Sequence, residues 1–293
     1  MNRQPGRRWE HLAQGIAGRP APVRLGIFIA ALLALWVPTA LPLLPALNAG
    51  ATWVKWVGPL LLYGEFLALI ALWGRWVRRF SYPLAGFGLV ASPTNGRELG
   101  WGLALAFVAL GALLGAESWL GWATWQAPGV NFPRILGEGL ALGLGVAVAE
   151  ELLFRGWLWT ELAQDYGAGR ATWISSGIFA VCHFLKPLAV ILATWVEFPG
   201  LMALGLALAW GRQATAGRLG FPIGFHGGLV WAYYLVQVGK LLQVNPEVPQ
   251  WLTGINGNPL ASAPGLGVMA VLAWGLRHRA IQKQQSRSGK PHQ

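Results

Sequence analysis

Three ionisable side chains lie together in the middle of an apolar, helix-length run that extends from about residue 135 to 159. Insertion scales assign roughly 2.5–3.5 kcal/mol to one charged side chain at the centre of a membrane-spanning helix. Glu151 and Arg155 are four residues apart, so they share a helical face and can neutralise each other. Glu150 points about 100° away, where its own helix offers no partner. An unpaired acid inside a membrane predicts a functional site, and the alternative is a structural polar cluster that fixes helix register.

Two later apolar runs each carry a histidine, His183 four residues after Phe179, and His226. Counted at about 1.5 Å per residue from the ends of their spans, Glu150 and His183 come near mid-depth and His226 lies somewhat closer to the cytoplasm. A single histidine in a membrane helix is often only a hydrogen-bonded core residue. Three polar side chains on three helices favour a shared cavity.

A carboxylate and two imidazoles support two routes to hydrolysis. Glu150, His183 and His226 can bind a divalent ion such as Zn²⁺ and leave one position open for water. Without a metal, the carboxylate acts as general base on a water while an imidazole stabilises the developing charge. The residues leave both routes open, so the cofactor is either Zn²⁺ or none.

The composition indicates which elements position these residues. Of the 293 residues, 55% are hydrophobic and only 11% are charged, which is typical of a polytopic membrane protein. We therefore predict an all-α, polytopic membrane helical bundle of about eight transmembrane helices. The predicted spans lie near residues 25–47, 53–74, 100–120, 135–159, 171–187, 200–211, 219–240 and 264–276.

The basic residues predict an orientation. With the N-terminus inside, seventeen of the 22 Lys and Arg residues fall in inside segments and only Lys55, Arg134, Lys186 and Lys240 fall outside. Both termini are therefore predicted to be cytoplasmic, most simply at the plasma membrane. The net charge of +11 then reflects membrane flanks and their lipid headgroups, not nucleic acid.

The same reading divides the chain into three parts. Residues 1–24 form a basic cytoplasmic arm, residues 25–280 form the transmembrane bundle, and residues 281–293 form a basic cytoplasmic tail. The candidate site residues all fall within a core of about residues 135–240.

The order and approximate spacing of Glu150-Glu151-x3-Arg155, Phe179-x3-His183 and His226 resemble those of the CAAX-protease and bacteriocin-processing family, which includes the type II CAAX prenyl endopeptidases. The resemblance covers about residues 135–240. It implies an eight-helix intramembrane peptidase in which Glu150 activates water and His183 and His226 complete the site. It also implies that Arg155 holds Glu151 in place, by either a metal-free glutamate mechanism or a zinc-assisted one.

One position departs from that family. Its last motif often reads His-x3-Asn or His-x3-Asp, whereas Val230 stands four residues after His226. Valine has no hydrogen-bond donor, so it cannot polarise a scissile carbonyl. Tyr233, on the same helical face as His226, and His183 are the candidates to supply the missing hydrogen bond. Without either, the fold would remain while peptidase chemistry was slowed or lost.

The sequence thus predicts an endopeptidase acting on a membrane-associated peptide or protein. The alternative is a catalytically inactive membrane scaffold, chaperone or immunity protein on the same fold. A proton-coupled transporter also places Glu and His in helices, but the paired repeats and broken helices typical of transporters are not found in this sequence. The substrate is not specified, although a prenylated CAAX tail is the best-known target in the resembling family.

Overall fold

Helices account for most of the chain in the computed structural model, which describes residues 5–288. The first four residues of the basic arm and the last five of the basic tail lie outside the described residues. In the first half the elements are α1 (Pro5–Ala17), α2 (Ala21–Ala40), η1 (Leu41–Leu43), α3 (Leu44–Asn48), α4 (Val54–Leu72), η2 (Trp73–Val77), α5 (Pro83–Gly86), α6 (Pro93–Trp119), β1 (Ala123–Trp125) and α7 (Phe132–Glu150).

The second half begins at the pair of adjacent glutamates. Its elements are η3 (Glu151–Leu158), α8 (Trp159–Cys182), α9 (Leu188–Thr194), η4 (Trp195–Glu197), α10 (Phe198–Ala214), α11 (Gly220–Val238), β2 (Leu242–Val244), α12 (Gln250–Thr253), η5 (Pro259–Ala261) and α13 (Ala263–Ser288). The segments η2 and η3 are π-helices, whereas η1, η4 and η5 are 3₁₀ turns.

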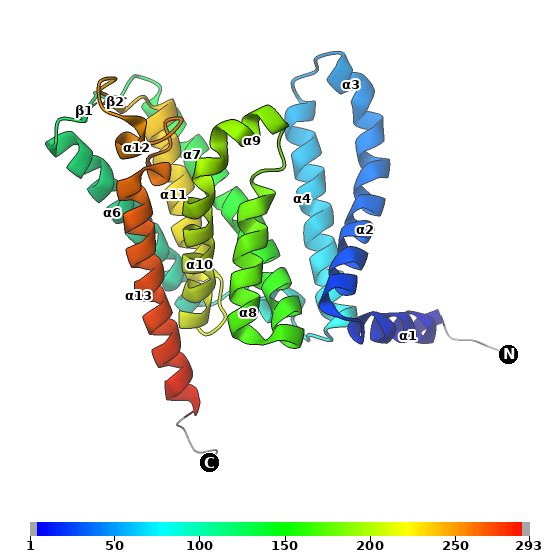
Figure 1. The fold of residues 1–293 in the computed structure, drawn as a ribbon. Coiled ribbons are helices and arrows are strands. Elements are labelled where there is room, and N and C mark those ends of the chain that lie inside the picture. Colours follow the sequence, from blue (N-terminus) through cyan, green and yellow to red (C-terminus); the bar gives the residue numbers. More distant parts are fainter. Residues whose placement is uncertain (1–4, 289–293) are drawn as a thin grey trace.

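The helical membrane bundle is present, but the number of eight spans is not confirmed. Within residues 5–288, four helical stretches are long and apolar enough to cross a membrane: Ala21–Asn48, Val54–Val77, Pro93–Trp119 and Leu188–Ala214. The other four predicted spans also fall on helices. Their apolar character is diluted, for example by the two glutamates and the arginine where α7 meets η3. The last of the four stretches is bent, because α9 runs across the end of the bundle before α10 turns along it (Figure 1).

A short antiparallel ribbon departs from the all-helical expectation. β1 pairs with β2, with Ala123 opposite Val244 and Trp125 opposite Leu242. It joins the loop after α6 to the loop after α11 on the side of the molecule opposite α1 (Figure 1). The Asn245 amide donates to the Trp122 carbonyl over 2.8 Å, which extends the pairing by one residue on each strand.

The helices α2 and α4 form a pair that stands to one side of the remaining bundle (Figure 1). Their contacts with the rest gather at one end, where the Phe28 ring stacks on Trp157 at a centroid distance of 3.9 Å. Trp73 packs edge-on against Phe28 at 5.4 Å. In the same region α1 runs roughly perpendicular to the bundle (Figure 1), so the pair is anchored at the α1 side.

Close helix packing sets the place of α11, which carries His226. A Cβ on Gly224 would lie 2.0 Å from the Leu99 carbonyl oxygen of α6, and one on Gly143 of α7 would lie 2.6 Å from the Gly227 oxygen. Only glycine allows backbones to approach so closely. α11 is therefore held between α6 and α7, directly beside the helix that ends at Glu150.

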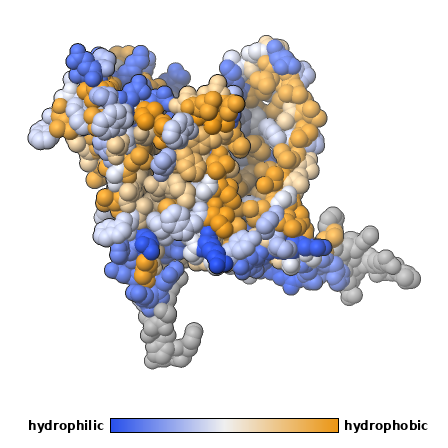
Figure 2. Space-filling model, in the orientation of Figure 1, coloured by the Kyte–Doolittle hydropathy of each residue, from blue (hydrophilic) through white to orange (hydrophobic). Residues whose placement is uncertain are grey.

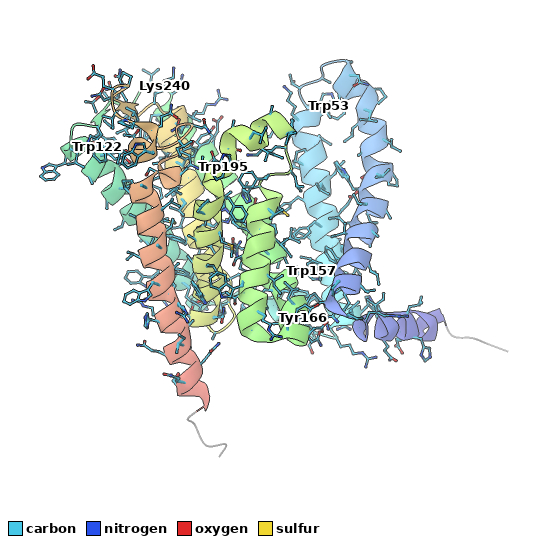
Figure 3. The ribbon with its side chains drawn as sticks, in the orientation of Figure 1. Trp53, Trp122, Trp157, Tyr166, Trp195 and Lys240 are labelled. Carbon is cyan, nitrogen blue, oxygen red and sulfur yellow. The ribbon has the colours of Figure 1, made fainter. Side chains whose placement is uncertain are left out.

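The outer surface has the distribution expected of a membrane protein. An apolar band covers the middle of the visible face and hydrophilic residues gather at both ends (Figure 2). Trp53, Trp122 and Trp195 lie towards one end and Tyr166 towards the other (Figure 3). Trp and Tyr are enriched at the two membrane interfaces, so these rings mark the edges of the apolar band.

Candidate active site

Glu151 lies at the centre of a buried polar group formed by three elements. The Arg155 guanidinium donates from Nη1 to Glu151 Oε1 over 2.9 Å, so the pair expected from the four-residue spacing is present. The same oxygen lies 2.8 Å from His226 Nδ1 on α11. Glu151 is fully buried and Arg155 is 1% exposed. The guanidinium group balances the charge of the buried carboxylate, and the two hydrogen bonds fix its orientation.

Two further contacts hold Arg155. Its Nη2 donates to the Gly205 carbonyl of α10 over 3.2 Å. Its guanidinium carbon lies 4.2 Å from the centre of the Phe179 ring of α8, a cation–π distance. Arg155 therefore ties η3 to both α8 and α10.

Glu150 lies on the other side of His226. Its Oε2 is 3.9 Å from His226 Nε2, and this oxygen is buried without a hydrogen-bond partner among the described residues. The whole side chain is 29% exposed, because it also lines a groove. His226 is thus bonded to Glu151 through one ring nitrogen and faces Glu150 with the other.

Both glutamates reach one histidine from the junction of α7 and η3. Glu150 ends α7 and Glu151 begins the eight-residue π-helix. Both have α-helical backbone angles, so their side chains diverge by about 100°, as adjacent residues of a helix do. His226 lies between them, and each carboxylate faces a different nitrogen of its ring.

His183 lies near this group, at the end of α8. Its Nδ1 is 2.8 Å from the Phe179 carbonyl oxygen, and since a carbonyl only accepts, Nδ1 carries the proton. The Phe179 ring packs edge-on against both imidazoles, with centroid distances of 4.6 Å to His183 and 6.1 Å to His226. Phe179 therefore contacts Arg155 and both histidines.

An apolar groove leads to Glu150 from the side of α2 and α4. Its cavity volume is about 260 Å³. The lining residues are Leu32 of α2, Pro59, Leu62, Tyr63 and Phe66 of α4, Ala149 and Glu150 of α7, and Leu153 of η3. Figure 2 shows the surface hollowed between the α2–α4 pair and the rest of the molecule. Glu150 is the only carboxylate among these lining residues.

The segment that forms this site matches a known family. Residues 132–232 match the model of the type II CAAX prenyl endopeptidase Rce1-like family. The match covers about a third of the chain, so the similarity to the Rce1-like family is that of this segment. The family is a protease family of membrane proteins, so the resemblance inferred from the motifs is confirmed. Comparison with curated proteins and with solved structures gave no match.

The candidate site shows no preformed metal centre among the described residues. Both imidazoles use Nδ1 for a protein partner and leave Nε2 unbonded, the second-shell arrangement common for metal-binding histidines. However, within residues 5–288 no three His, Cys, Asp or Glu side chains lie close enough together to hold an ion. The zinc set predicted from sequence, Glu150, His183 and His226, is not among such groups and stays a prediction.

Val230, which departs from the family motif, and Tyr233, the candidate replacement donor, both lie on α11. Val230 lies one turn beyond His226 on α11 and is half-buried. The Tyr233 hydroxyl donates to the Gly257 carbonyl over 3.4 Å, in the loop after α12. The proposed use of Tyr233 as a hydrogen-bond donor to substrate stays a prediction, because this contact directs its hydroxyl to a loop.

A second buried polar cluster, which no sequence pattern predicted, ties α2 and η2 to α8. Glu161 is fully buried and accepts from Arg24 Nε over 2.6 Å, from Arg78 Nε over 2.6 Å and from Trp73 Nε1 over 2.9 Å. Arg24 also bonds Asp165 over 3.0 Å. The partners are 83–137 residues apart in sequence, so no local spacing could reveal them.

Asp165 is the partly exposed carboxylate of that cluster, on α8. Partial burial raises the pKa of its carboxyl, but the hydrogen bonds from Arg24 and from the Ala21 amide, together with the charges of Arg24 and Arg78, lower it by more. The net pKa lies below the ordinary value, so this carboxylate is charged at neutral pH and its ion pair with Arg24 is intact.

Proposed function

We propose that the protein is an intramembrane endopeptidase that hydrolyses a peptide bond in a membrane-associated peptide or protein, with Glu150 as general base. One observation carries the proposal: Glu150 Oε2 is buried, lacks a hydrogen-bond partner among the described residues and faces His226 Nε2 at 3.9 Å. An unpartnered acid at such a place is expected at a site of chemistry.

The gap between these two atoms suits a water molecule. A separation of 3.9 Å is too long for a direct hydrogen bond but allows one water to contact both atoms. Glu151 Oε1 accepts from Arg155 Nη1, and with His226 Nδ1 donating to the same oxygen, a singly protonated His226 presents a lone pair at Nε2. A bridging water would therefore donate to Glu150 and to His226, leaving its own lone pair for attack.

The proton balance of hydrolysis then follows from Glu150. As the water oxygen bonds to the scissile carbonyl carbon, one water proton passes to Glu150 and the carbonyl oxygen becomes an oxyanion. As the C–N bond breaks, the leaving nitrogen takes that proton from Glu150. The second water proton leaves from the product carboxyl group, for which His226 Nε2 is the neighbouring acceptor. General base assistance of this kind contributes roughly 10²–10⁴-fold to the rate.

The supporting residues orient this pair. Glu151 fixes the tautomer and direction of His226, Arg155 fixes Glu151, and Phe179 packs against Arg155 and both imidazoles. His183 can stabilise the oxyanion only when it is protonated, because its single neutral-state proton is used on the Phe179 carbonyl.

The apolar groove and the apolar outer surface favour a substrate that enters the site from the membrane. The groove is apolar apart from Glu150 and opens beside α2 and α4, so it suits an apolar segment of a membrane-associated peptide or protein. Membrane lipids are the other expected partners. We place the protein in the plasma membrane with both termini in the cytoplasm, on the distribution of its basic residues.

The test compares Glu150→Gln with Glu138→Gln, a control on the same helix whose carboxylate is 43% exposed in a surface pair with Arg134. Purified proteins in detergent are assayed against a broad set of membrane-associated peptides, with and without a chelator. We expect Glu150→Gln to lower kcat by roughly 10²–10⁴-fold at unchanged folding, and Glu138→Gln to behave as wild type. Full activity of Glu150→Gln would refute the mechanism. Folded wild-type protein that cleaves none of the peptides would favour the inactive scaffold.

A further inference from the structure

We propose that Gly205 of α10 is a positioning residue of the candidate site, because its missing side chain lets a backbone carbonyl reach Arg155. The inference rests on the proposed function for its kinetic consequence only. The geometric consequence, a change in the state of His226, holds whether or not the protein cleaves peptides.

The first step is the contact between Arg155 and α10. The Gly205 carbonyl lies in the interior of α10, where it also serves the helical hydrogen bond, and its second lone pair accepts from Arg155 Nη2 over 3.2 Å. Arg155 is 1% exposed, so water does not replace this acceptor. A buried guanidinium group that loses an acceptor must rearrange to satisfy its N–H groups.

The second step is the packing that makes this contact possible. A Cβ built on Gly205 would lie 3.0 Å from Ser176 Cβ, 3.2 Å from Ser176 Cα and 3.3 Å from the Ser176 oxygen. Two of these atoms belong to the backbone of α8, so a side-chain rotation cannot relieve the contact. Alanine at position 205 would therefore push α10 away from α8 by a few tenths of an ångström.

The third step is the effect of that shift on the site. The Arg155–Gly205 hydrogen bond is already 3.2 Å long, so a small separation weakens or breaks it. Ser176 lies one turn before Phe179, whose ring packs against Arg155 and His226. The Gly205 carbonyl and the Phe179 ring, which hold Arg155 from outside its own helix, thus both depend on the distance between α8 and α10 at Gly205. Through Glu151 Oε1, a displaced Arg155 changes the hydrogen bond at His226 Nδ1.

Two glycines provide matched controls for Gly205→Ala. Gly177, next to Ser176 on α8, has open space at its Cβ position, so Gly177→Ala adds the same methyl group without a collision. Gly200 is on α10 itself, and a Cβ there would meet the Leu260 oxygen at 3.1 Å, away from Arg155. Gly200→Ala therefore reports what tight packing alone does to α10.

The first measurement is independent of activity. Nitrogen-15 NMR of histidine-labelled protein in detergent, with His226 assigned through His226→Gln, reports the protonation and hydrogen bonding of each ring nitrogen. We expect Gly205→Ala to shift the His226 Nδ1 signal, and both control variants to leave it as in wild type.

The second measurement is kinetic. We expect Gly205→Ala to lower kcat roughly tenfold to a hundredfold, the effect of a small misplacement of catalytic groups, with KM changed less than twofold. The double variant Ser176→Gly/Gly205→Ala removes the Cβ–Cβ collision and should recover part of kcat and part of the wild-type His226 signal, relative to Ser176→Gly alone.

The outcomes separate the two hypotheses. A wild-type protein without peptidase activity would refute the proposed function. The NMR comparison would then decide whether Gly205 positions Arg155 and His226. Gly205→Ala with wild-type His226 signals, or with changes equal to those of Gly200→Ala, would refute the positioning role. If Gly205→Ala does not fold, the double variant carries the same comparison. Failure of both to fold beside a folded Gly200→Ala would assign Gly205 to packing alone.

Discussion

Glu151 serves two partners through a single oxygen, and this sharing makes the site sensitive to either of them. Arg155 and His226 both bond Oε1, while Oε2 is buried without a partner among the described residues. A change at Arg155 is therefore transmitted directly to His226. The spacing of Glu151 and Arg155 predicted their pair, but a separation of 75 positions between Glu151 and His226 gave no sign of the second bond.

Val230 is the residue at which a gain of activity is expected. Val230→Asn places a side-chain amide one turn from His226, where neither Tyr233 nor neutral His183 offers a free donor proton. An added oxyanion donor is worth roughly 10²–10³-fold in turnover when nothing replaces it. We expect Val230→Asn to raise kcat by a factor of that order.

Kinetic comparison of three variants tests this expectation. Tyr233→Phe is expected to change kcat little, because its hydroxyl bonds Gly257, whereas His183→Ala is expected to lower kcat. Val230→Leu is the control for volume at position 230. A crippled Tyr233→Phe together with an unchanged Val230→Asn would show that Tyr233 supplies the donor after all.

At the scale of elements, the sequence predicted helices but not their winding or their deeper contacts. The apolar runs and the charges located α7, α8 and α11, and the resemblance ordered Glu150, His183 and His226 along them. The π-winding of η3 could not be predicted, because its residues also suit an α-helix. Nor could the Gly205 contact, since one glycine among 40 carries no signal of the backbone it will meet.

The Glu161 cluster joins elements that local spacing cannot connect, and we expect it to dominate the attachment of α2. Glu161→Gln removes the charge that Arg24 and Arg78 share, and both cations are nearly fully buried. Breaking a buried ion pair at one partner destabilises by roughly 3–5 kcal/mol. Thermal unfolding in detergent should show a marked decrease in Tm.

The surface pair Arg134–Glu138 is the matched control for that measurement. Its side chains are 80% and 43% exposed, so Glu138→Gln should change stability by at most about 1 kcal/mol. Equal Tm values for Glu161→Gln and Glu138→Gln would mean that the buried cluster does not hold α2 and η2 to α8.

At the scale of the whole molecule, the predicted orientation can be tested by labelling. The end of α13 and the helix α1 lie on one side of the bundle, and Lys240 lies on the other (Figures 1 and 3). In a Cys182→Ala background, we expect Lys240→Cys to react with a membrane-impermeant thiol reagent in intact cells and Lys290→Cys to react only after lysis. The reverse pattern would invert the orientation.

The attachment of α2 and α4 at one end relates this protein to the thickness of its bilayer. The Phe28–Trp157 stack and the Glu161 cluster fix the pair near α1, while the far ends of α2 and α4 expose large apolar side chains such as Trp56 and Leu60. Hydrophobic helices tilt when their length and the hydrocarbon thickness differ. A tilt about the fixed end would change the width of the groove beside Glu150, so the acyl-chain length of the surrounding lipids becomes a determinant of substrate access.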